Sequence, residues 1–213
     1  MANENKLKKF ESDDPKTVFD FIFKNFFLAF APMQKRKEFV ELLKIFKEKK
    51  PKTILEIGTA KGGTLFCFCK LALQDATIIS IDLPEGPFGG GYPEWKRPIY
   101  KSFSKTDQKL HLLRKDSHKE ETLEEVRKIL GDNKLDFLFI DGTHAYEGVK
   151  KDFEMYGPLV KEEGIIAFHD IVKTPEVNGN VPRLWKEIKA GKKYEEFVKN
   201  WDQSGYGIGV IYK

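Results

Sequence analysis

The sequence predicts an α/β fold: a Rossmann-like, doubly wound sheet of seven strands, mainly parallel and with an antiparallel last strand. Three observations lead to this prediction. From residue 53 onward, short apolar runs alternate with amphipathic helical stretches, which is typical of βαβ units with right-handed crossovers. The apolar runs are rich in Ile, Leu and Phe with little alternation, as expected of strands that are covered on both faces. The tail ends in two further apolar runs, separated by a turn at Asp202–Gly205.

The expected elements follow from these runs. Strands are expected at Thr53–Gly58, Thr77–Leu83, Leu110–Arg114, Leu135–Asp141, Gly164–Asp170, Tyr194–Lys199 and Tyr206–Tyr212. Helices are expected at Gly63–Leu73, Glu120–Leu130 and Tyr146–Val160. We therefore expect residues 51–213 to form one domain. A chain of 213 residues is long enough to bury roughly 70% of its unfolded surface in a single core.

Residues 1–50 are expected to form an N-terminal cap of two helices. The first of these helices carries six phenylalanines within twelve positions, more than one helix face can bury against a sheet. They are Phe19, Phe21, Phe23, Phe26, Phe27 and Phe30. A lid over the active site, or a contact between the subunits of a homo-oligomer, would bury the remainder.

The connection at residues 84–108 is a loop insertion rich in Gly, Pro and aromatic residues. A connection of this length in a compact domain is usually functional or disordered. Phe88, Tyr92 and Trp95 flank the Gly89–Gly91 run, which favours a mobile cover that packs on a ligand.

Charge and cysteine usage limit the classes of partner. The net charge is only +4, and no basic stripe is interleaved with aromatic residues, so a nucleic-acid partner is not expected. Cys67 and Cys69 stand two positions apart in an expected helix, where they cannot form a disulfide with each other, and they lack the second cysteine pair of a zinc site. Buried free thiols in a reducing, cytoplasmic compartment are expected.

The sequence gives no sign of a membrane segment. Its most apolar stretch, Val18–Ala31, contains Asp20, Lys24 and Asn25 and is too short to cross a bilayer. No basic start followed by an apolar run and a small-residue cleavage site is found at the beginning of the sequence. We therefore expect no membrane partner.

The stretch from Leu55 to Thr64 ends an expected strand and opens a helix, which is where ligands of open α/β sheets bind. Its glycines stand at positions 58, 62 and 63, a spacing that does not match the dinucleotide fingerprint and so disfavours a pyrophosphate cradle. Glu56 would repel a diphosphate, whereas it would tolerate or attract an ammonium or sulfonium group. Asp82 ends the next strand, at the position where an acid accepts hydrogen bonds from ribose hydroxyls.

A second group of residues points to metal and base chemistry. Asp141 and Asp170 end neighbouring expected strands, and two carboxylates that converge there can hold a hard cation through oxygen. His144 follows Asp141 on the same loop, and its ordinary pKa suits general-base catalysis near neutral pH. The alternative is that the acids cap the following helices and that the histidine is a polar surface residue.

These motifs carry a family resemblance. The pattern Glu-x-Gly-x-x-x-Gly, followed by an acid at the end of the second strand, resembles the signature of class I S-adenosylmethionine-dependent methyltransferases. Further motifs follow in order and resemble the branch of cephalosporin-hydroxylase-like proteins and metal-dependent macrolide sugar O-methyltransferases. They run from Leu83 to Tyr92, from Asp116 to His118, from Phe139 to His144 and from Phe168 to Ile171. The resemblance covers residues 50–213 well and the N-terminal helices poorly.

The resemblance implies an S-adenosylmethionine-dependent O-methyltransferase that acts on a hydroxyl of a small-molecule substrate such as a sugar. The expected cofactor-binding residues are Glu56, Gly58, Thr59, Gly62 and Thr64 in the loop, Asp82 at the ribose, and Asp116 and Ser117 at the adenine. The implied metal ligands are Asp141, His169 and Asp170, with His144 as the catalytic base. The resembling enzymes have an acidic residue where this chain has His169. Mg or Mn is expected if this imidazole turns away, a transition metal if it coordinates, and loss of the metal is the third alternative.

Three other functions are compatible with parts of the pattern. A nicotinamide-dependent dehydrogenase shares the fold, but the glycine spacing disfavours it. A metal-dependent hydroxylase with non-haem iron would use Asp141, His144 and His169 as its two histidines and one carboxylate. A non-catalytic, nucleotide-binding Rossmann-like module would result from loss of the metal.

Overall fold

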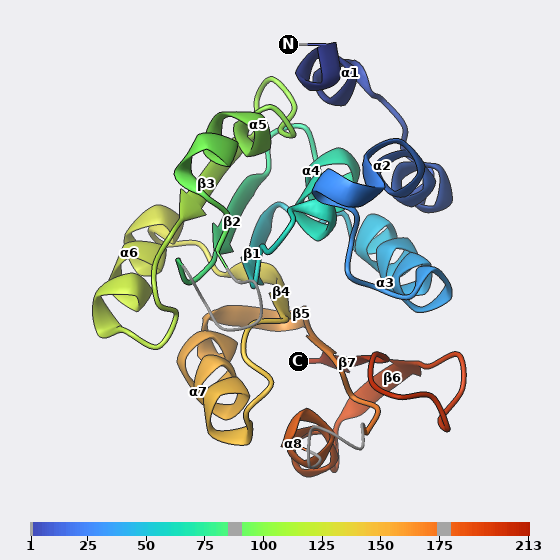
Figure 1. Cartoon of the computed structure of the whole chain (residues 1–213). Helices are drawn as coiled ribbons and strands as arrows, with labels where there is room; N and C mark the ends of the chain where they lie inside the picture. Colours follow the sequence, from blue (N-terminus) through green and yellow to red (C-terminus); the bar gives the residue numbers. More distant parts are fainter. Residues whose placement is uncertain (1, 85–90, 174–179) are drawn as a thin grey trace.

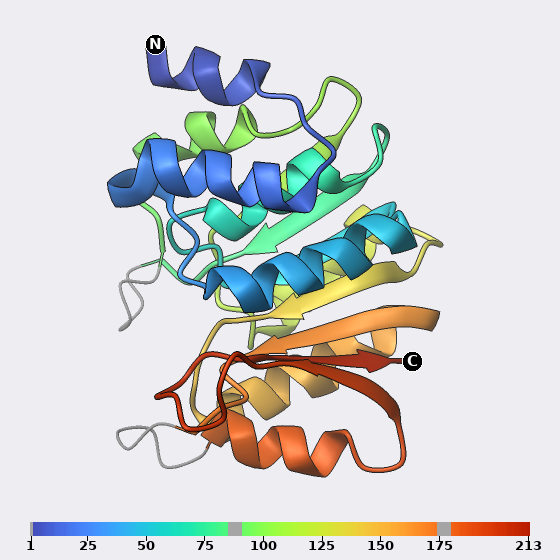
Figure 2. The ribbon, with the colours of Figure 1, turned by 90° about the vertical axis from the view of Figure 1, so that its right-hand side faces the viewer.

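The computed structural model describes residues 2–84, 91–173 and 180–213. Its centre is a seven-stranded sheet in the order β3-β2-β1-β4-β5-β7-β6 (Figure 1). The strands are β1 Thr53–Ile57, β2 Thr77–Ile81, β3 Lys109–Leu113, β4 Leu135–Ile140, β5 Val160–His169, β6 Lys193–Phe197 and β7 Ile208–Tyr212. The first five strands pair in parallel, and β7 pairs antiparallel with both β5 and β6. Figure 2 shows β7 pointing the opposite way to β4 and β5. The predicted fold class is confirmed.

Helices cover both faces of this sheet. They are α1 Ala2–Lys9, α2 Pro15–Phe30, α3 Arg36–Lys49, α4 Gly63–Leu71, α5 Arg97–Lys101, α6 Glu120–Leu130, α7 Tyr146–Tyr156 and α8 Asn180–Ile188, with short 3-10 helices η1 Glu94–Lys96 and η2 Gly157–Leu159. One apolar cluster joins α2, α3 and α4 to the sheet, and a second joins α6, α7 and α8 to its other face. Figure 1 shows these two groups of helices on opposite sides of the strands.

Neighbouring residues along each strand enter opposite clusters. Ile54 packs with the α2–α4 side, whereas Leu55 packs with the α6–α8 side, and Ile78 and Ile79 divide in the same way. Side chains of a strand alternate between the two faces of its sheet. Both faces of this sheet are covered, so both positions must be apolar. This explains why the strands read as continuous apolar runs in the sequence.

The N-terminal segment forms three helices rather than the two that were expected, because a short α1 precedes α2. The start of α2 has a strong local signal: Pro15 stands in its first turn, and Asp14 caps it by accepting a hydrogen bond from Thr17 N at 2.8 Å. Of the phenylalanines in α2, Phe19, Phe26 and Phe30 are buried in the core, and Phe21 and Phe23 are partly buried against it. The side chain of Phe27 lies outside the described part of the structure.

The 84–108 connection contains two short helices that the sequence did not predict, η1 and α5. Its tyrosines are anchored in the protein, since Tyr92 and Tyr100 are buried and their ring centroids lie 4.7 Å apart. Trp95 is exposed. Phe88 and the Gly89–Gly91 run were expected to take part in a mobile cover; residues 85–90 lie outside the described residues.

Three further differences concern the second half of the chain. The helix expected to reach Val160 ends at Tyr156 and is followed by η2, because Pro158 cannot continue an α-helix. β5 then begins at Val160, earlier than expected, with a register shift against β4. Helix α8 was not predicted; its described part packs Leu184 and Trp185 into the core. No helix among the described residues is long and apolar enough to cross a membrane.

The start of α3 is tied to the segment between β6 and β7 by a buried carboxylate. Glu38 is only 2% exposed. Its Oε1 accepts hydrogen bonds from Lys199 N at 2.9 Å and from Gln203 Nε2 at 2.7 Å, and its Oε2 accepts one from Gly207 N at 2.9 Å. Because a buried charge is tolerated only when it is hydrogen-bonded, this network fixes α3 against the 199–207 segment.

We expect Glu38→Ala to lower the free energy of unfolding by roughly 2–3 kcal/mol, because it leaves buried N–H groups without an acceptor. For a domain of this size, that corresponds to a fall of about 4–12 °C in the midpoint of thermal unfolding. Differential scanning calorimetry measures it. Glu41→Ala on the same helix is the matched control. Glu41 pairs with Lys44, both side chains are exposed, and the expected change is below about 0.5 kcal/mol. Equal effects of the two substitutions would contradict the assignment.

Candidate active site

A cavity of about 480 Å³ opens at the carboxyl ends of the parallel strands. One side is lined by the β1–α4 connection and by residues that follow β2 and β3. The other side is lined by residues that follow β4 and β5, together with residues 31–34 and Tyr206. All of the predicted site residues line this cavity except Glu56 and Gly62.

The two sides of the cavity meet at a glycine. Gly58 has φ +97°, and a Cβ atom there would lie 2.0 Å from the main-chain oxygen of Asp141. The main chain of Asp141 is held at this point by a hydrogen bond from its N to Ile57 O, at 2.9 Å. Only glycine combines this φ with such a close approach. The absence of a side chain at residue 58 therefore sets the loop after β1 directly against the loop after β4.

The same connection is covered by the segment that follows α2. A Cβ atom at Gly63, the first residue of α4, would lie 2.3 Å from both Phe30 O and Pro32 N. Residues 31–34 thus pass over the start of α4 before they reach the cavity. The N-terminal helices consequently supply part of its wall.

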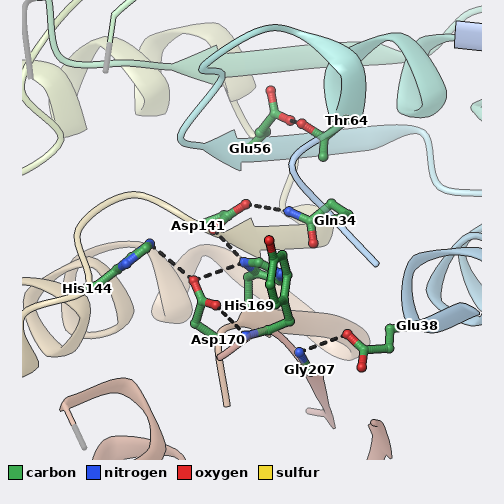
Figure 3. Close-up of polar contacts among 10 residues, drawn as sticks. Gln34, Glu38, Glu56, Thr64, Asp141, His144, His169, Asp170 and Gly207 are labelled. Carbon is green, nitrogen blue, oxygen red and sulfur yellow. Dashed lines mark hydrogen bonds and ion pairs between the residues drawn. The ribbon is translucent and has the colours of Figure 1, made fainter. Parts of the chain in front are cut away.

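Glu56 lies behind the loop rather than in the cavity. Its side chain accepts a hydrogen bond from Thr64 Oγ1 at 2.5 Å (Figure 3). It accepts another from Ser80 Oγ, also at 2.5 Å. Ser80 Oγ in turn lies 2.5 Å from Thr59 Oγ1. Burial raises the pKa of Glu56 to about 8, although the hydrogen bonds from Ser80 and Thr64 oppose this rise. In this arrangement Glu56 holds the loop residues in place, and only Thr59 and Thr64 among these hydroxyls line the cavity.

Asp82 follows β2 and lines the cavity beside the same loop. Its Oδ2 accepts a hydrogen bond from Ala60 N at 2.6 Å, and its Oδ1 accepts one from Gly91 N at 3.1 Å. Burial raises the pKa of Asp82, and these hydrogen bonds oppose the rise. Each carboxylate oxygen can accept a second hydrogen bond, so Asp82 retains acceptor capacity toward a ligand.

The residues that follow β3 line the cavity on the same side as the β1–α4 connection and Asp82. Asp116 Oδ1 accepts a hydrogen bond from His118 N at 2.9 Å, and Ser117 O accepts one from Tyr156 Oη at 2.7 Å. His118 also lines the cavity, with its Nε2 3.3 Å from Oδ1 of the buried Asp152. The contact with Asp152 raises the pKa of His118, while burial opposes it. Asp152 lies within α7 and carries no sequence motif that could have predicted this pair.

Four predicted residues come together on the opposite side, after β4 and β5 (Figure 3). His169 Nδ1 lies 3.0 Å from Asp141 Oδ1 and 3.1 Å from Asp170 Oδ2. His144 Nε2 lies 3.1 Å from the same Asp170 Oδ2. Asp170 has φ +61°, in the left-handed region that is uncommon for residues other than glycine. The sequence therefore predicted correctly that these side chains would be neighbours.

Contacts between the imidazoles and the carboxylates shift the pKa values of His169 and Asp170 in opposite directions. Burial disfavours a charged ring at His169, but the two flanking carboxylates outweigh it and raise the pKa of His169 to about 10. Burial likewise disfavours a charged Asp170, yet its contacts with His169 and His144 lower the pKa of Asp170 to about 2. Opposite charges in contact favour the charged form of both partners.

Among the described residues, one group has the composition and convergence of a metal site: Asp141, His144 and Asp170 each offer a ligand atom, and these atoms lie within 4.8 Å of one another. This set differs from the expected ligands Asp141, His169 and Asp170. His169 presents Nδ1 to the two carboxylates, and its Nε2 is buried without a hydrogen-bond partner in the described structure. Two carboxylates and one imidazole suit a divalent cation.

Sequence reasoning missed Gln34 and Tyr206. Gln34 Nε2 donates a hydrogen bond to Asp141 Oδ2 at 2.7 Å (Figure 3). Tyr206 N donates one to Asp170 Oδ1 at 2.8 Å. Both residues belong to irregular segments far from the site in sequence, and neither stands in a recognisable motif. The glycines on either side of Tyr206 were the one signal of unusual backbone at this position.

Comparison with solved structures supports the architecture. One similar structure is the O-methyltransferase TomG from Streptomyces achromogenes, involved in tomaymycin synthesis and in complex with SAM. It has a TM-score of 0.60 and 14% identity, and the match covers 96% of this chain and 91% of that chain. Another is an O-methyltransferase from Bacillus cereus in complex with SAH, with a TM-score of 0.60, 15% identity and coverage of 100% and 98%. At this level of identity the likeness shows the fold alone.

The curated relatives found by sequence comparison include two uncharacterized proteins. Uncharacterized protein y4gI of Sinorhizobium fredii is 30% identical over 170 residues, covering 76% of this chain and 17% of the relative. Uncharacterized protein R132 of Acanthamoeba polyphaga mimivirus is 30% identical over 148 residues, covering 68% of this chain and 64% of the relative. The chain thus matches less than two thirds of the length of either relative.

The family described as "Methyltransferase domain" matches residues 55–171. This range is more than half of the chain; it begins within β1, ends just after Asp170, and contains every site residue that the sequence predicted. Gln34, Glu38 and Tyr206 lie outside it. The match agrees with the sheet order, with the glycine loop after β1 and with the acid at the end of β2. The chain belongs to the methyltransferase-domain family, as the sequence predicted.

Proposed function

We propose that the protein transfers a methyl group from S-adenosylmethionine to a hydroxyl group of a small molecule. The observation that carries this proposal is the single cavity of about 480 Å³. It joins the glycine loop and Asp82 on one side to the carboxylate and imidazole group on the other. A cofactor site and a site able to deprotonate a hydroxyl therefore share one space. The two similar solved structures, an O-methyltransferase with SAM and another with SAH, support the choice of cofactor and reaction.

The cavity fits the cofactor through its shape and its acceptors. The loop residues Gly58, Thr59 and Thr64 would border the methionine part, and Asp82 would accept hydrogen bonds from the ribose. Asp116 and Ser117 would border the adenine. Glu56 and Gly62 would act indirectly, because they lie outside the lining and Glu56 holds Thr64 and Ser80. When bound, S-adenosylmethionine supplies an activated methyl group on a sulfonium centre.

The carboxylate and imidazole group fits a divalent cation by the chemistry of its donors. Asp141 and Asp170 would hold the ion, and the convergence of donor atoms supports His144 as the third ligand ahead of His169. When bound, a divalent cation would lower the pKa of a coordinated hydroxyl group. His169, between the two carboxylates, would keep them oriented.

His144 has a second candidate role, as the base that takes the proton from the acceptor hydroxyl. It lines the cavity and lies 3.1 Å from Asp170, which can stabilise the imidazolium that would form. The roles of ligand and base exclude each other for the same nitrogen. The effect of His144→Ala on Mn²⁺ binding and on turnover separates the role of ligand from the role of base.

The acceptor is proposed from the sequence resemblance as a small hydroxyl compound such as a sugar. The hydroxylase alternative is less well supported, because the donor group that converges among the described residues has two carboxylates and one histidine rather than two histidines and one carboxylate.

We expect the wild-type protein to bind S-adenosylhomocysteine in titration calorimetry and not to bind NAD. Asp82→Ala should weaken this binding by roughly 10- to 100-fold, because hydrogen bonds to a charged group contribute about 1.5–3 kcal/mol each. Asp75→Ala is the matched control: Asp75 is an exposed acid at the other end of β2, paired with Lys52, and its loss should leave the affinity unchanged. NAD binding without S-adenosylhomocysteine binding would reject the proposed function.

The metal site is tested by comparing two histidines. If His144 is a ligand and His169 is not, His144→Ala should weaken Mn²⁺ binding by at least tenfold, while His169→Asp should leave the metal preference unchanged. A shift of His169→Asp toward Mg²⁺ would instead assign the imidazole of His169 as a ligand, because the substitution makes the site all oxygen. Titration followed by Mn²⁺ electron paramagnetic resonance measures both. Asp141→Ala and Asp170→Ala should lose the ion in either case. In a crystal soaked with Mn²⁺, absence of an anomalous peak within about 2.5 Å of both carboxylates would exclude the site.

If His144 is instead the base, His144→Ala should retain Mn²⁺ and S-adenosylhomocysteine binding while its turnover falls by about 10²–10⁴-fold. The pH profile of kcat should lose its limb on the acidic side, because the wild type needs the neutral imidazole. His111→Ala serves as control, since His111 lies in β3 and does not line the cavity. Unchanged turnover from mildly acidic to mildly alkaline pH would show that His144 takes no proton.

A further inference from the structure

Three successive residues after β6 have a left-handed backbone: Gly205 with φ 71°, Tyr206 with φ 62° and Gly207 with φ 79°. Glycine adopts this conformation at no steric cost. A bulky aromatic residue does so rarely and under strain, and strained backbone of this kind is concentrated at functional sites. The left-handed backbone of Tyr206 is therefore unusual, whereas that of Gly205 and Gly207 is ordinary for glycine.

The backbone of Tyr206 is held in place from three directions. Tyr206 N donates to Asp170 Oδ1 at 2.8 Å, and Tyr206 O accepts from Val172 N at 3.0 Å. The next residue, Gly207, donates its N–H to the buried Glu38 at 2.9 Å. All of these bonds use main-chain atoms of residues 206 and 207, so glycine or asparagine at residue 206 would make them with less strain. The fold consequently does not require a tyrosine here, and the reason for it must lie in its side chain.

The ring of Tyr206 lies at the mouth of the cavity. It lines the cavity and is 38% exposed. Its centroid lies 5.8 Å from that of His169, edge to face at 75°, and 4.9 Å from Lys35 Nζ. The ring therefore borders the carboxylate and imidazole side of the cavity. The acceptor hydroxyl has to reach this side if the proposed function is correct.

The surroundings of the ring define the acceptor that fits. Met33 also lines the cavity and is 55% exposed, and its neighbour Gln34 is bonded to Asp141. Tyr206 and Met33 thus present two large, partly exposed side chains, whereas Asp141, His144 and Asp170 bring donor atoms within 4.8 Å of one another. Such a site matches a ligand with one polar edge and a flat apolar body. A polyol would leave most of its hydroxyls against apolar side chains, which is costly.

We propose that Tyr206 is an acceptor-binding residue whose ring packs against the flat face of an aromatic acceptor, a phenol or catechol, with the reacting hydroxyl toward Asp170. This inference rests on the proposed function and narrows it, because it favours an aromatic hydroxyl over the sugar hydroxyl implied by the sequence resemblance. The left-handed backbone is then the means by which the ring is brought over the site.

Catechol and myo-inositol are suitable probes, because both carry neighbouring hydroxyls on a six-membered ring and only catechol is flat and apolar. Both are titrated into the full chain loaded with S-adenosylhomocysteine and Mn²⁺, as wild type and as Tyr206→Phe, Tyr206→Asn and Tyr206→Gly. We expect catechol to bind wild type and Tyr206→Phe with similar affinity, and Tyr206→Asn and Tyr206→Gly about tenfold more weakly. Myo-inositol should bind none of them.

Thermal unfolding of the same variants separates a ligand-binding role from a structural one. Because glycine relieves the strain, the unfolding midpoint of Tyr206→Gly should equal that of wild type or exceed it by up to about 4 °C. A lower midpoint with unchanged catechol affinity assigns a structural role and overturns the inference. The inference is also overturned if catechol does not bind the wild-type protein loaded with S-adenosylhomocysteine and Mn²⁺, or if myo-inositol binds in its place. If the wild-type protein does not bind S-adenosylhomocysteine at all, the proposed function itself is rejected, whatever the role of Tyr206.

Discussion

The site depends on the contact between Gly58 and the main chain of Asp141. A side chain at residue 58 would collide with the Asp141 carbonyl at 2.0 Å, so the two loops could not share one edge of the sheet. Parallel pairing of β1 with β4 brings the loops to the same edge, and the glycine allows them to touch. This contact places the loop after β1 against the loop after β4, and residues of both loops line the same cavity.

The elements that were predicted correctly are those with a local cause. β1, β2 and β4 are buried on both faces and so read as apolar runs, and Pro15 together with the Asp14 cap marks the start of α2. The neighbourhood of Asp141 and Asp170 followed from topology, since both end adjacent strands. Gln34, Glu38 and Tyr206 could not be predicted in the same way. Their partners are more than 30 residues away in the chain, and their role depends on how irregular segments pack.

The pKa values of the buried acids are shifted in opposite directions on the two sides of the cavity. Beside the loop after β1, Glu56 behind the loop and Asp82 in the lining are buried acids whose partners are hydroxyls and main-chain N–H groups, and burial raises the pKa of each. On the other side, Asp170 has the imidazoles of His144 and His169 as partners, and its pKa is lowered. Burial thus favours the neutral form of Glu56 and Asp82, whereas the carboxylate and imidazole groups of the other side favour each other's charged form.

The buried Glu38 has a consequence for the motions of the protein. Its carboxylate holds the amides of Lys199 and Gly207, and α3 cannot leave the sheet without releasing them. Amide hydrogens that are protected by the same interaction become exposed together when that interaction breaks, and they then exchange with solvent together. The amides of the 199–207 segment and the first turn of α3 therefore belong to one cooperative unit, although more than 150 residues separate Glu38 from Lys199. This unit also carries Tyr206, so its opening would move part of the cavity lining together with the start of α3.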